Sequence, residues 1–440
     1  MTDEFFRTDV FPRRSPAPYE IMAPAGSWEA LSAALQAGAD AVYFGVESLN
    51  MRSLAAKTFT LDDLPEIVGR SREAGVRTYL TVNTVLYDED LPLMRKILER
   101  AKTEGVSAVI LSDAAALAYA RAIGLEAHLS TQLNISNVEA LRFYAQFADV
   151  FVPARELTLE QIGTIAEAIR RDGITGPSGR PVQIEAFCHG ALCMAISGKC
   201  HLSTHTRGKS ANRGECLQNC RRTYRLVDAE RGIEIDVEGQ RFLSPKDLKT
   251  IGFLDRMVAS GVTVFKIEGR ARGPEYVRTT VECYREALDA VLEGRWTESM
   301  RTVWDERLAR VFNRGFWDGW YLGAQTIETT KDYGSSATEK KVYVGKCLNY
   351  FSKSGVGHFH LEAGSLRKGD RYLVTGPTTG AVIGSVDAMR ADETEAEKSP
   401  SECPSASAST TDFIVSIPFS EDLASREKER ERRLLRFSLF

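Results

Sequence analysis

Four cysteines between residues 193 and 220 are the residues whose type and spacing most directly suggest chemistry. They follow the order Cys193-x6-Cys200-x15-Cys216-x3-Cys220, in a polar stretch rich in glycine and arginine. Four thiolates can complete one coordination shell. Together with Cys188, five of the eight cysteines of the chain lie in this region. We therefore expect segment 185–225 to carry the functional centre.

The spacing of these thiols leaves four interpretations open. Zinc sites usually draw on cysteines two to four residues apart, and only Cys216 and Cys220 approach that pattern. An iron–sulfur cluster tolerates irregular spacing, because loops can supply its thiolates from different directions. A catalytic thiol would need a base, and His189, His201 and His205 are close in sequence. The fourth interpretation is buried free thiols. The spacing favours the cluster first and zinc second.

The N-terminal residues bear on the redox state of these thiols. The run Met1-Thr2-Asp3-Glu4-Phe5-Phe6-Arg7 lacks the basic and then apolar pattern of a secretory signal, and no apolar run approaches the length of a membrane span. We therefore expect a cytoplasmic protein with no membrane association. In such a compartment, clustered cysteines bind metal or do redox chemistry more often than they form disulfides.

The net charge of -4 and the pI near 6.0 argue against a nonspecific binder of polyanions. A local basic patch nevertheless surrounds the cysteines. Its six members are the candidate RNA-binding residues: Arg207, Lys209, Arg213, Arg221, Arg222 and Arg225. A solvated surface segment is the alternative interpretation of this charge.

Short β-branched runs alternate with amphipathic segments along the first three hundred residues, which is the rhythm of repeated strand–helix units. The expected strands are Tyr19–Ala23, Ala41–Phe44, Arg77–Val82, Ala108–Leu111, Glu126–Leu129, Val150–Val152, Gln183–Ala186 and Val264–Ile267. No Gly-x-Gly-x-x-Gly follows the first strand, so the usual mark of a dinucleotide-binding sheet is missing. We predict an α/β fold with a TIM-like (β/α) barrel over residues 19–328, after an N-terminal extension at 1–18.

A second, all-β domain is predicted after a linker at residues 329–340. Within 341–440 the expected strands are Lys341–Leu348, Gly357–Leu361, Arg371–Thr375, Val382–Val386 and Phe413–Ile417, which suggest a small β-barrel. Residues 391–411 are rich in Glu, Ser, Ala and Pro and are predicted to form a disordered insertion. The run Arg426–Arg436 is interpreted as a mixed-charge helix.

Active sites of such barrels lie at the carboxyl ends of the strands, so polar residues at those positions are candidates. For Ser112, Asp113 and Glu156 we expect structural roles as helix caps or loop anchors. For His189, Glu268 and Arg270 we expect functional roles.

Several runs of the sequence resemble the collagenase-like peptidase family of unassigned catalytic type, peptidase family U32. The longest runs from Glu185 to Ser203, EAFCHGALCMAISGKCHLS, and Asn212–Arg221 continues the likeness. Shorter matches are Met22–Gly26, Lys266–Arg270 and Phe312–Phe316. The resemblance extends from about Tyr19 to Val386. Within the family, the barrel followed by a short β domain is most similar to the tRNA hydroxylation protein P branch.

That resemblance implies an oxygen-independent hydroxylase that forms 5-hydroxyuridine at the wobble position of tRNA. It also implies prephenate as the hydroxyl-donor co-substrate and a 4Fe-4S cluster. The family's four ligands map onto Cys193, Cys200, Cys216 and Cys220. Four further residues are then candidates for positioning the nucleobase and the carboxylates of prephenate: Glu185, His189, Glu268 and Arg270. The sequence departs from the family at Cys188, where an aliphatic residue is more usual, and in the insertion at 391–411.

Two other functions stay open. The first is proteolysis by a collagenase-like peptidase, although no Ser-His-Asp set, His-Glu-x-x-His motif or activated cysteine can be assigned from the residues. The second is a noncatalytic RNA-binding protein in which the cysteines only hold a loop in place. Relatives that hydroxylate ribosomal RNA or quinone precursors share the cysteines, so the cysteines do not identify the substrate.

Overall fold

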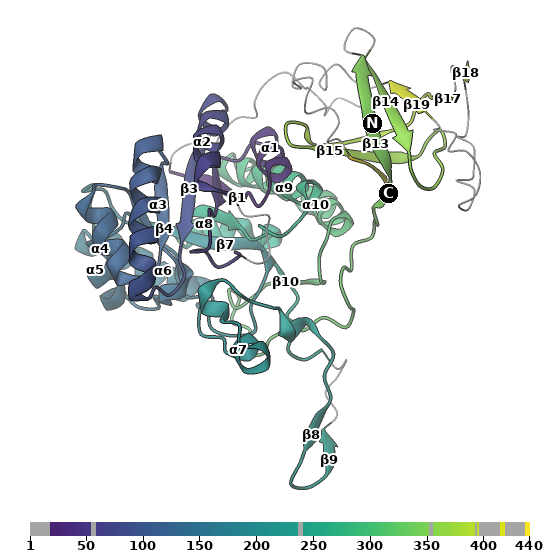
Figure 1. Cartoon of the computed structure of the whole chain (residues 1–440). Coiled ribbons are helices and arrows are strands. Elements are labelled where there is room, and N and C mark those ends of the chain that lie inside the picture. Colours follow the sequence, from purple (N-terminus) through teal and green to yellow (C-terminus); the bar gives the residue numbers. More distant parts are fainter. Residues whose placement is uncertain are drawn as a thin grey trace.

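The computed structural model describes residues 18–53, 59–235, 241–351, 355–391, 394–395, 414–418 and 436–440. Its larger part is a closed barrel of eight parallel strands surrounded by helices (Figure 1). The strands follow one another around the barrel in chain order, and the last pairs with both the first and the seventh. They are β1 (Glu20–Pro24), β2 (Ala41–Phe44), β3 (Arg77–Val82), β4 (Ala108–Leu111), β5 (Ala127–Leu129), β6 (Val150–Phe151), β7 (Gln183–Ala191) and β11 (Val262–Ile267).

The predicted TIM-like barrel is thus confirmed, and each strand lies within two residues of its expected bounds except at the end of β7. That strand continues because its second half pairs antiparallel with β10 (Asp247–Lys249), which places Lys249 opposite His189. Strand β12 (Phe316–Trp317) extends the sheet beside β10. His189 therefore belongs to a strand and not to the loop after it.

Helices cover the outside of the barrel. They are α1 (Trp28–Gln36), α2 (Leu64–Glu73), α3 (Leu91–Glu104), α4 (Ala114–Ala122), α5 (Val138–Ala145), α6 (Leu159–Asp172), α8 (Leu254–Ala259), α9 (Pro274–Leu292) and α10 (Glu298–Arg310). Asp113 caps α4 by accepting from the Ala115 N–H at 2.8 Å, as predicted, and the Ser112 hydroxyl donates to the Asn83 carbonyl at 3.0 Å. Glu156 is exposed. None of the described helices combines the length and apolar character needed to cross a membrane.

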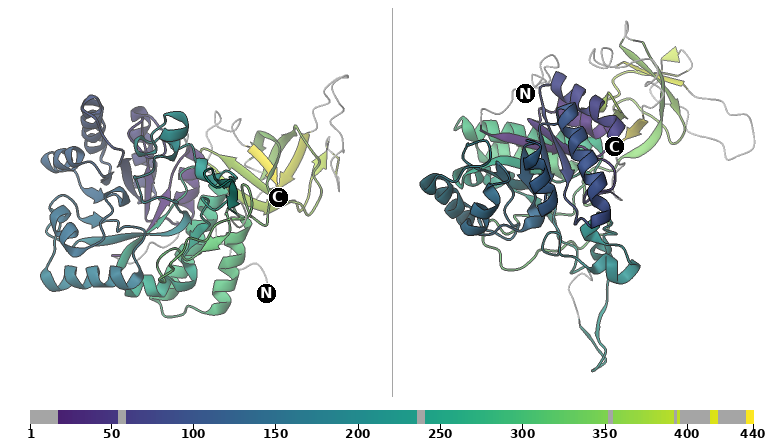
Figure 2. Two further views of the ribbon diagram at one scale, coloured as in Figure 1. Left: turned by 90° about the horizontal axis from the view of Figure 1, so that it is seen from below. Right: turned by 60° about the vertical axis from the view of Figure 1, so that its left-hand side comes forward.

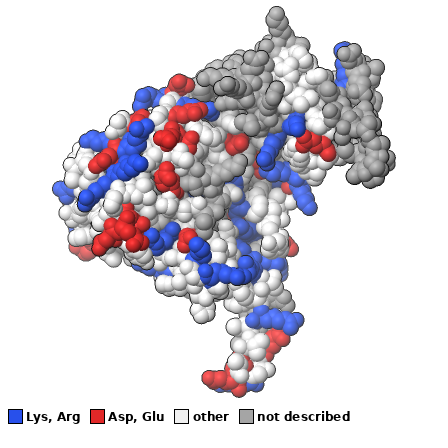
Figure 3. Space-filling model, viewed as in Figure 1, with Lys and Arg blue, Asp and Glu red and all other residues white. Residues whose placement is uncertain are grey.

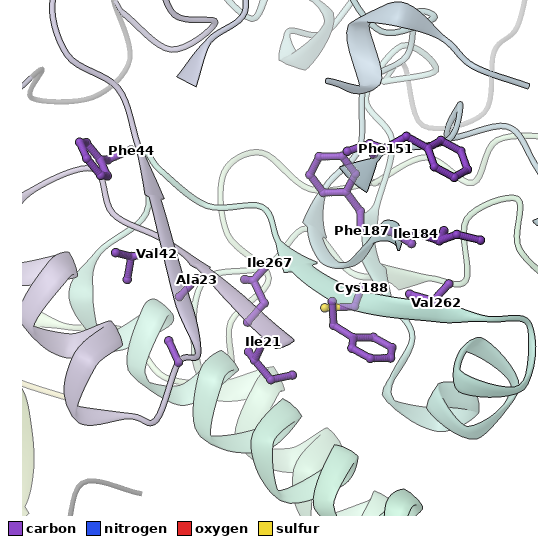
Figure 4. Close-up of a cluster of buried hydrophobic side chains, with 14 of the residues drawn as sticks. Ile21, Ala23, Val42, Phe44, Phe151, Ile184, Phe187, Cys188, Val262 and Ile267 are labelled. Atoms are coloured by element: carbon purple, nitrogen blue, oxygen red, sulfur yellow. The ribbon is translucent and has the colours of Figure 1, made fainter. Parts of the chain in front are cut away.

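Alternating side chains divide the barrel core into two layers, because successive strand residues point to opposite faces. Ile21, Val42, Phe44 and Ile267 belong to the outer layer that packs under the helices (Figure 4). The inner layer fills the barrel with Met22, Ala41, Tyr43, Tyr79, Ala108, Ile110, Val150 and Val264. The barrel interior is therefore packed, and a binding site has to lie at one of its ends.

The second part of the chain forms an eight-stranded antiparallel sheet, which confirms the all-β prediction. Its order is β16-β15-β20-β13-β14-β19-β17-β18. The strands are β13 (Val342–Phe351), β14 (Val356–Leu361), β15 (Arg371–Gly376), β16 (Gly380–Ser385), β17 (Arg390–Ala391), β18 (Thr394–Glu395), β19 (Ile414–Pro418) and β20 (Arg436–Leu439). Among the described residues no pairing joins the outer strands β16 and β18, so the ladders form a sheet rather than the closed barrel expected.

Three predictions fall partly outside the described residues. Of the predicted extension at 1–18, residues 1–17 lie outside the described part of the chain. Of the predicted insertion at 391–411, residues 392–393 and 396–411 lie outside it, whereas Ala391 and Thr394–Glu395 belong to two short paired strands. Of the predicted helix Arg426–Arg436, only Arg436 is described. It begins strand β20, because this strand fills the gap between β13 and β15.

The small domain contacts the barrel through the hairpin of β15 and β16 and through Lys341, which lies 2.7 Å from Glu275 of α9 (Figures 1 and 2). Strand β16 packs on α1, where Ala33 shares a buried apolar cluster with Leu373 and Ala381. The loop between β15 and β16 adds polar contacts, since the Ser32 hydroxyl and Arg70 Nη1 both donate to the Pro377 carbonyl, at 2.5 and 3.0 Å. The domain thus lies against the outside of helix α1.

Candidate active site at the barrel mouth

The cysteine segment (residues 192–225) lies over the carboxyl ends of the barrel strands, here called the mouth. It contains the short helix α7 (Leu202–Arg207) and is followed by the hairpin of β8 (Leu226–Asp228) and β9 (Ile233–Ile235), which extends away from the barrel (Figure 1). Hydrogen bonds tie it to the loops after β5, β2 and β3. Asn134 Nδ2 donates to the Ser197 carbonyl (3.0 Å), Ser53 Oγ to the Gly214 carbonyl (3.3 Å), and the Val85 N–H to the Asn212 carbonyl (3.1 Å). The segment therefore covers the end of the barrel where active sites form.

All four cysteines of the segment are free thiols, and Cys193, Cys200 and Cys216 lie near enough to Cys220 to interact with it electrostatically. Cys193 is exposed, and the other three are partly buried. Burial raises the pKa of Cys220, nearby Arg221 lowers it, and Cys193, Cys216 and Cys200 each raise it further. The fold thus places near one another thiols that are up to 27 residues apart in the chain.

The chemistry of this donor set suits an iron–sulfur cluster in type and number. A single metal ion needs its cysteine donors at about 2.3 Å from one point. Among the described residues, no group of three or more His, Cys, Asp or Glu side chains is arranged to hold such an ion. The thiolates around a cubane bind separate irons and stand farther apart. Four thiols match such a cluster in donor type and number.

Glu268 lies beneath the cysteine segment, at the end of β11. Its Oε1 accepts from Arg52 Nη2 at 2.9 Å and from Arg52 Nε at 3.3 Å, and its Oε2 accepts from the Tyr43 hydroxyl at 3.1 Å. Burial opposes ionisation of Glu268, but Arg52, Arg155 and Arg270 outweigh it and lower its pKa to about 2. Glu268 is therefore a fixed anion that does not exchange protons near neutral pH.

Arg270 enters the mouth from the same loop and is buried. Its Nη1 donates to Thr81 Oγ1 at 2.9 Å and to Asn50 Oδ1 at 3.1 Å. Its backbone is locked against the loop after β1, because a Cβ on Gly26 would lie 1.7 Å from the Arg270 carbonyl oxygen. Glycine at position 26 is thus required for the close approach that sets the position of Arg270.

Several buried polar atoms at the mouth have no hydrogen-bond partner among the described residues. They are Thr84 Oγ1, Gln132 Oε1, Asn134 Oδ1, Arg155 Nε and Arg270 Nε, which follow β3, β5, β6 and β11. Buried polar atoms are nearly always paired in folded proteins. Their concentration at the ends of four strands indicates a site for a ligand with both donor and acceptor groups.

Glu185 lies deeper, inside the barrel. Its Oε1 is 2.6 Å from Lys266 Nζ, and its Oε2 is 3.2 Å from His128 Nδ1. Burial opposes ionisation of Glu185, but Lys266 and His128 outweigh it and lower its pKa. The structure thus brings Glu268 and Arg270 together at the mouth, whereas Glu185 belongs to an ionic network below them.

His189 contacts Glu268 through its backbone, since its carbonyl accepts from the Glu268 N–H at 2.8 Å. Its ring lies among Tyr276, Tyr284 and Phe316, and its Nδ1 is 3.3 Å from the Tyr284 hydroxyl. Burial, together with nearby Lys249 and Arg272, lowers the pKa of His189 to about 3. The imidazole is therefore neutral and packed between the sheet and α9.

Three residues of these networks were missed from the sequence: Arg52, His128 and Lys266. A signal existed for Lys266 and His128, because a charged or titratable residue within a strand buried on both faces needs a partner. Arg155 follows β6, and its guanidinium lies 4.1 Å from the centre of the Phe187 ring. Arg52 lies in a loop after β2, and its position gave no signal beyond its charge.

The six predicted RNA-binding residues differ in how far they are free to meet a ligand. Arg213 forms a two-pronged ion pair with Asp90, at 2.6 and 3.2 Å, and Lys209 lies 2.8 Å from Glu215. Arg225 lies 3.7 Å from Glu234. These three basic side chains are thus partly neutralised.

Arg207 and Arg222 are exposed and have no ion pair with any described residue. Arg221 instead turns inward, and its Nη atoms donate to main-chain carbonyls. Elsewhere the two charge signs are interspersed over the barrel surface, as Figure 3 shows for one face. Of the predicted patch, Arg207 and Arg222 are therefore the side chains most free to meet a ligand.

Comparison with known proteins agrees with the organisation of the barrel. The family model described as peptidase family U32 matches residues 26–331. A protein named collagenase from Porphyromonas gingivalis (strain ATCC BAA-308 / W83) is 54% identical over 410 residues, which cover 93% of this chain and 97% of that protein. The matched region includes the cysteine segment and the mouth.

Proteins named for RNA hydroxylation are also similar. The tRNA hydroxylation protein P1 of Bacillus subtilis (strain 168) is 31% identical over 366 residues, covering 81% of this chain and 83% of that protein. The 23S rRNA 5-hydroxycytidine C2501 synthase of Escherichia coli (strain K12) is 36% identical over 278 residues, covering 63% of this chain but 40% of that protein. The relatives therefore carry names of two different activities.

Proposed function

Because the chain belongs to peptidase family U32, whose relatives are named for either RNA hydroxylation or proteolysis, we propose that it is an RNA-modifying hydroxylase. The substrate proposed is tRNA, with 5-hydroxyuridine formed at the wobble position. A 4Fe-4S cluster is the proposed cofactor, and prephenate is the proposed hydroxyl donor. One observation carries the proposal: four free thiols gather over a barrel mouth lined with unpartnered buried polar atoms.

The thiols of Cys193, Cys200, Cys216 and Cys220 would hold the cluster. When bound there, the cluster would supply one-electron transfer close to the mouth. The electrostatics of the mouth support this arrangement, since Arg52 interacts with both Glu268 and Cys216. The same guanidinium thus lies close to both Glu268 and Cys216.

The arginines of the mouth suit a carboxylate-bearing co-substrate. Arg155 and Arg270 each retain a buried Nε–H with no partner among the described residues. A guanidinium binds a carboxylate through charge-assisted hydrogen bonds. Glu268 already pairs with Arg52, so it leaves these two arginines to a ligand. In this proposal Arg155 and Arg270 bind the carboxylates of prephenate.

The nucleobase has to enter the same mouth. Enzymes that modify a base act on single-stranded substrate or on a base turned out of the stack. In this proposal the unpartnered oxygens of Gln132 and Asn134 read the base edge, and the exposed Arg207 and Arg222 meet the RNA phosphates.

Metal analysis after anaerobic purification tests the cofactor. We expect about four irons and four acid-labile sulfides per chain in the wild type. Cys216→Ala should lose them, whereas Cys283→Ala, which removes a buried thiol of α9, should keep them. One tightly held zinc, or no metal in the wild type, would contradict the cluster.

Proteolysis is the second candidate function. It is favoured by the 54% identity to the P. gingivalis protein named collagenase, which spans nearly all of both chains. A peptidase should digest gelatin whether or not iron is present. Changing a single thiol should abolish that digestion. A hydroxylase should instead lose its activity when any one of the four cysteines is changed, and should leave gelatin intact.

A further inference from the structure

An unusual group of arginines lies beside the cysteines, around a single buried carboxylate. Asp247 is 1% exposed; its Oδ2 lies 3.0 Å from Arg272 Nη2, and its Oδ1 lies 3.4 Å from Arg314 Nη1. Strand pairing places Asp247 opposite Ala191, two residues before Cys193. Arg221, next to Cys220 in the chain, interacts electrostatically with Asp247 and with Cys193.

The charges in this group do not balance. Arg221, Arg272 and Arg314 supply three positive charges, against one negative charge on Asp247. Arg272 and Arg314 are 8% and 14% exposed, so water screens them poorly. Burial and the neighbouring Arg221 and Arg272 lower the pKa of Arg314 to about 10. Buried positive charge in excess is costly unless a further anion lies close by.

Arg221 also bridges two parts of the cysteine segment. Its Nη2 donates to the carbonyl of Leu192 at 2.6 Å, and its Nη1 donates to the carbonyl of Pro245 at 2.6 Å and to Ser244 Oγ at 3.1 Å. Arg241 in turn donates to the Arg221 carbonyl at 3.0 Å. One planar side chain thus links the residue after Cys220 to the residue before Cys193.

We propose that Arg221 is a positioning residue for the metal-binding thiols, and that Arg221, Arg272 and Arg314 form a cationic wall that offsets the negative charge of the thiolate-bound cluster. This inference rests on the proposed function. Cys193 and Cys220 are held near each other by Arg221 without any contribution from the metal. The excess positive charge stabilises the more negative, reduced state of the cluster and so raises its midpoint potential, because net charge is one of the determinants of that potential.

Glutamine and lysine variants separate the two roles. Arg221→Gln removes both the charge and the fork of donors, and Arg221→Lys keeps the charge alone. Arg314→Gln removes a charge of the wall without touching the cysteine segment's hydrogen bonds. Arg222→Gln is the matched control, since Arg222 is the exposed neighbour of Arg221. Each protein is reconstituted anaerobically with iron and sulfide, challenged with a chelator, and titrated with reductant while its spectrum is recorded.

Both Arg221 variants should retain iron about 10- to 100-fold more weakly than the wild type, as expected for the loss of an outer-shell partner of metal ligands. Arg314→Gln should keep its iron and shift the midpoint potential to a more negative value. Arg221→Gln should show a negative shift as well, whereas Arg221→Lys stays closer to the wild-type potential. Arg222→Gln should match the wild type in both measurements.

Wild-type potentials in both Arg221→Gln and Arg314→Gln would overturn the cationic wall, and wild-type iron retention in Arg221→Gln would overturn the positioning role. Arg314→Gln keeps the test of the wall available if Arg221→Gln does not fold. A wild-type protein that takes up no iron gives a different result, because it contradicts the proposed function itself together with this inference.

Discussion

Arg52 and Glu268 form an ion pair of 2.9 Å between the loop after β2 and the end of β11. The pair lies at the mouth, and Arg52 also interacts electrostatically with Cys216 of the cysteine segment. The Tyr43 hydroxyl donates to the second oxygen of the same carboxylate at 3.1 Å. Glu268 therefore connects the barrel, its packed interior and the segment that covers it.

Replacing Glu268 by glutamine should weaken this connection and make the free energy of unfolding less dependent on pH in the acidic range. The pKa of Glu268 is depressed to about 2, so its contribution to stability is present above the ordinary glutamate pKa of 4.5 and is lost as the pH falls towards 2. At neutral pH we expect Glu268→Gln to lower the free energy of unfolding by about 1–3 kcal/mol. Urea unfolding at several pH values measures both effects. An unchanged difference between the variant and wild type from pH 7 to pH 3 would contradict the assignment.

His128 should give the opposite pH dependence. Burial alone would lower its pKa, but the carboxylates of Glu126, 3.8 Å from Nε2, and Glu185, 3.2 Å from Nδ1, outweigh burial and raise the pKa above 6.5. The stabilisation is thus fully present below 6.5 and is lost as the pH rises through the raised pKa. We expect the stability advantage of wild type over His128→Gln to shrink between pH 6 and pH 9. An advantage that grows with pH would show that the ring is neutral in the folded protein.

Gly26→Ala should displace Arg270 from the mouth. The added Cβ would lie 1.7 Å from the Arg270 carbonyl oxygen, so the loops after β1 and β11 have to separate. We expect a loss of about 1–3 kcal/mol in stability and a larger loss of activity. Gly69→Ala, in α2, is the matched control: its Cβ would meet nothing within 4 Å, and alanine is favoured in a helix by about 1 kcal/mol. Equal melting temperatures for the two variants would contradict the close approach.

Cys188 tests whether a nearby thiol acts as a nucleophile. It is completely buried in β7, and burial raises its pKa well above the ordinary value, so no thiolate is available. We expect Cys188→Ala to keep its iron and its RNA-modifying activity, whereas Cys193→Ala loses both. Iron analysis and mass spectrometry of tRNA nucleosides measure these outcomes. Loss of gelatin digestion in Cys188→Ala alone would instead support the peptidase.

The sequence predicted the strands far better than their pairing. Runs of β-branched residues located all eight barrel strands, because burial on both faces leaves a strong local signal. Strand β20 was missed, since Arg436–Leu439 is short and becomes a strand only between β13 and β15. The continuation of β7 to Ala191 depends on β10, which follows more than fifty residues later in the chain.

The candidate site was predicted only in part, because local sequence signals locate strand ends but do not show which side chains meet. The ends of barrel strands can be located from the sequence, and this identified Glu268 and Arg270, which lie together at the mouth. The partners of a strand side chain depend on the elements packed around it. The sequence therefore did not show that Glu185 pairs with Lys266 or that the His189 ring packs beside Tyr284. The inward turn of Arg221 likewise depends on carbonyls at Leu192 and Pro245 that only the folded chain brings near.

We propose that the thiols over the mouth serve RNA hydroxylation. Mass spectrometry of tRNA nucleosides tests this in a host that lacks its own 5-hydroxyuridine formation and is complemented with the wild type or with Cys216→Ala. We expect 5-hydroxyuridine to appear with the wild type and to be missing with Cys216→Ala, although both proteins accumulate. Iron-loaded wild type that binds tRNA but forms no modified nucleoside would contradict the claim and indicate a noncatalytic RNA-binding protein.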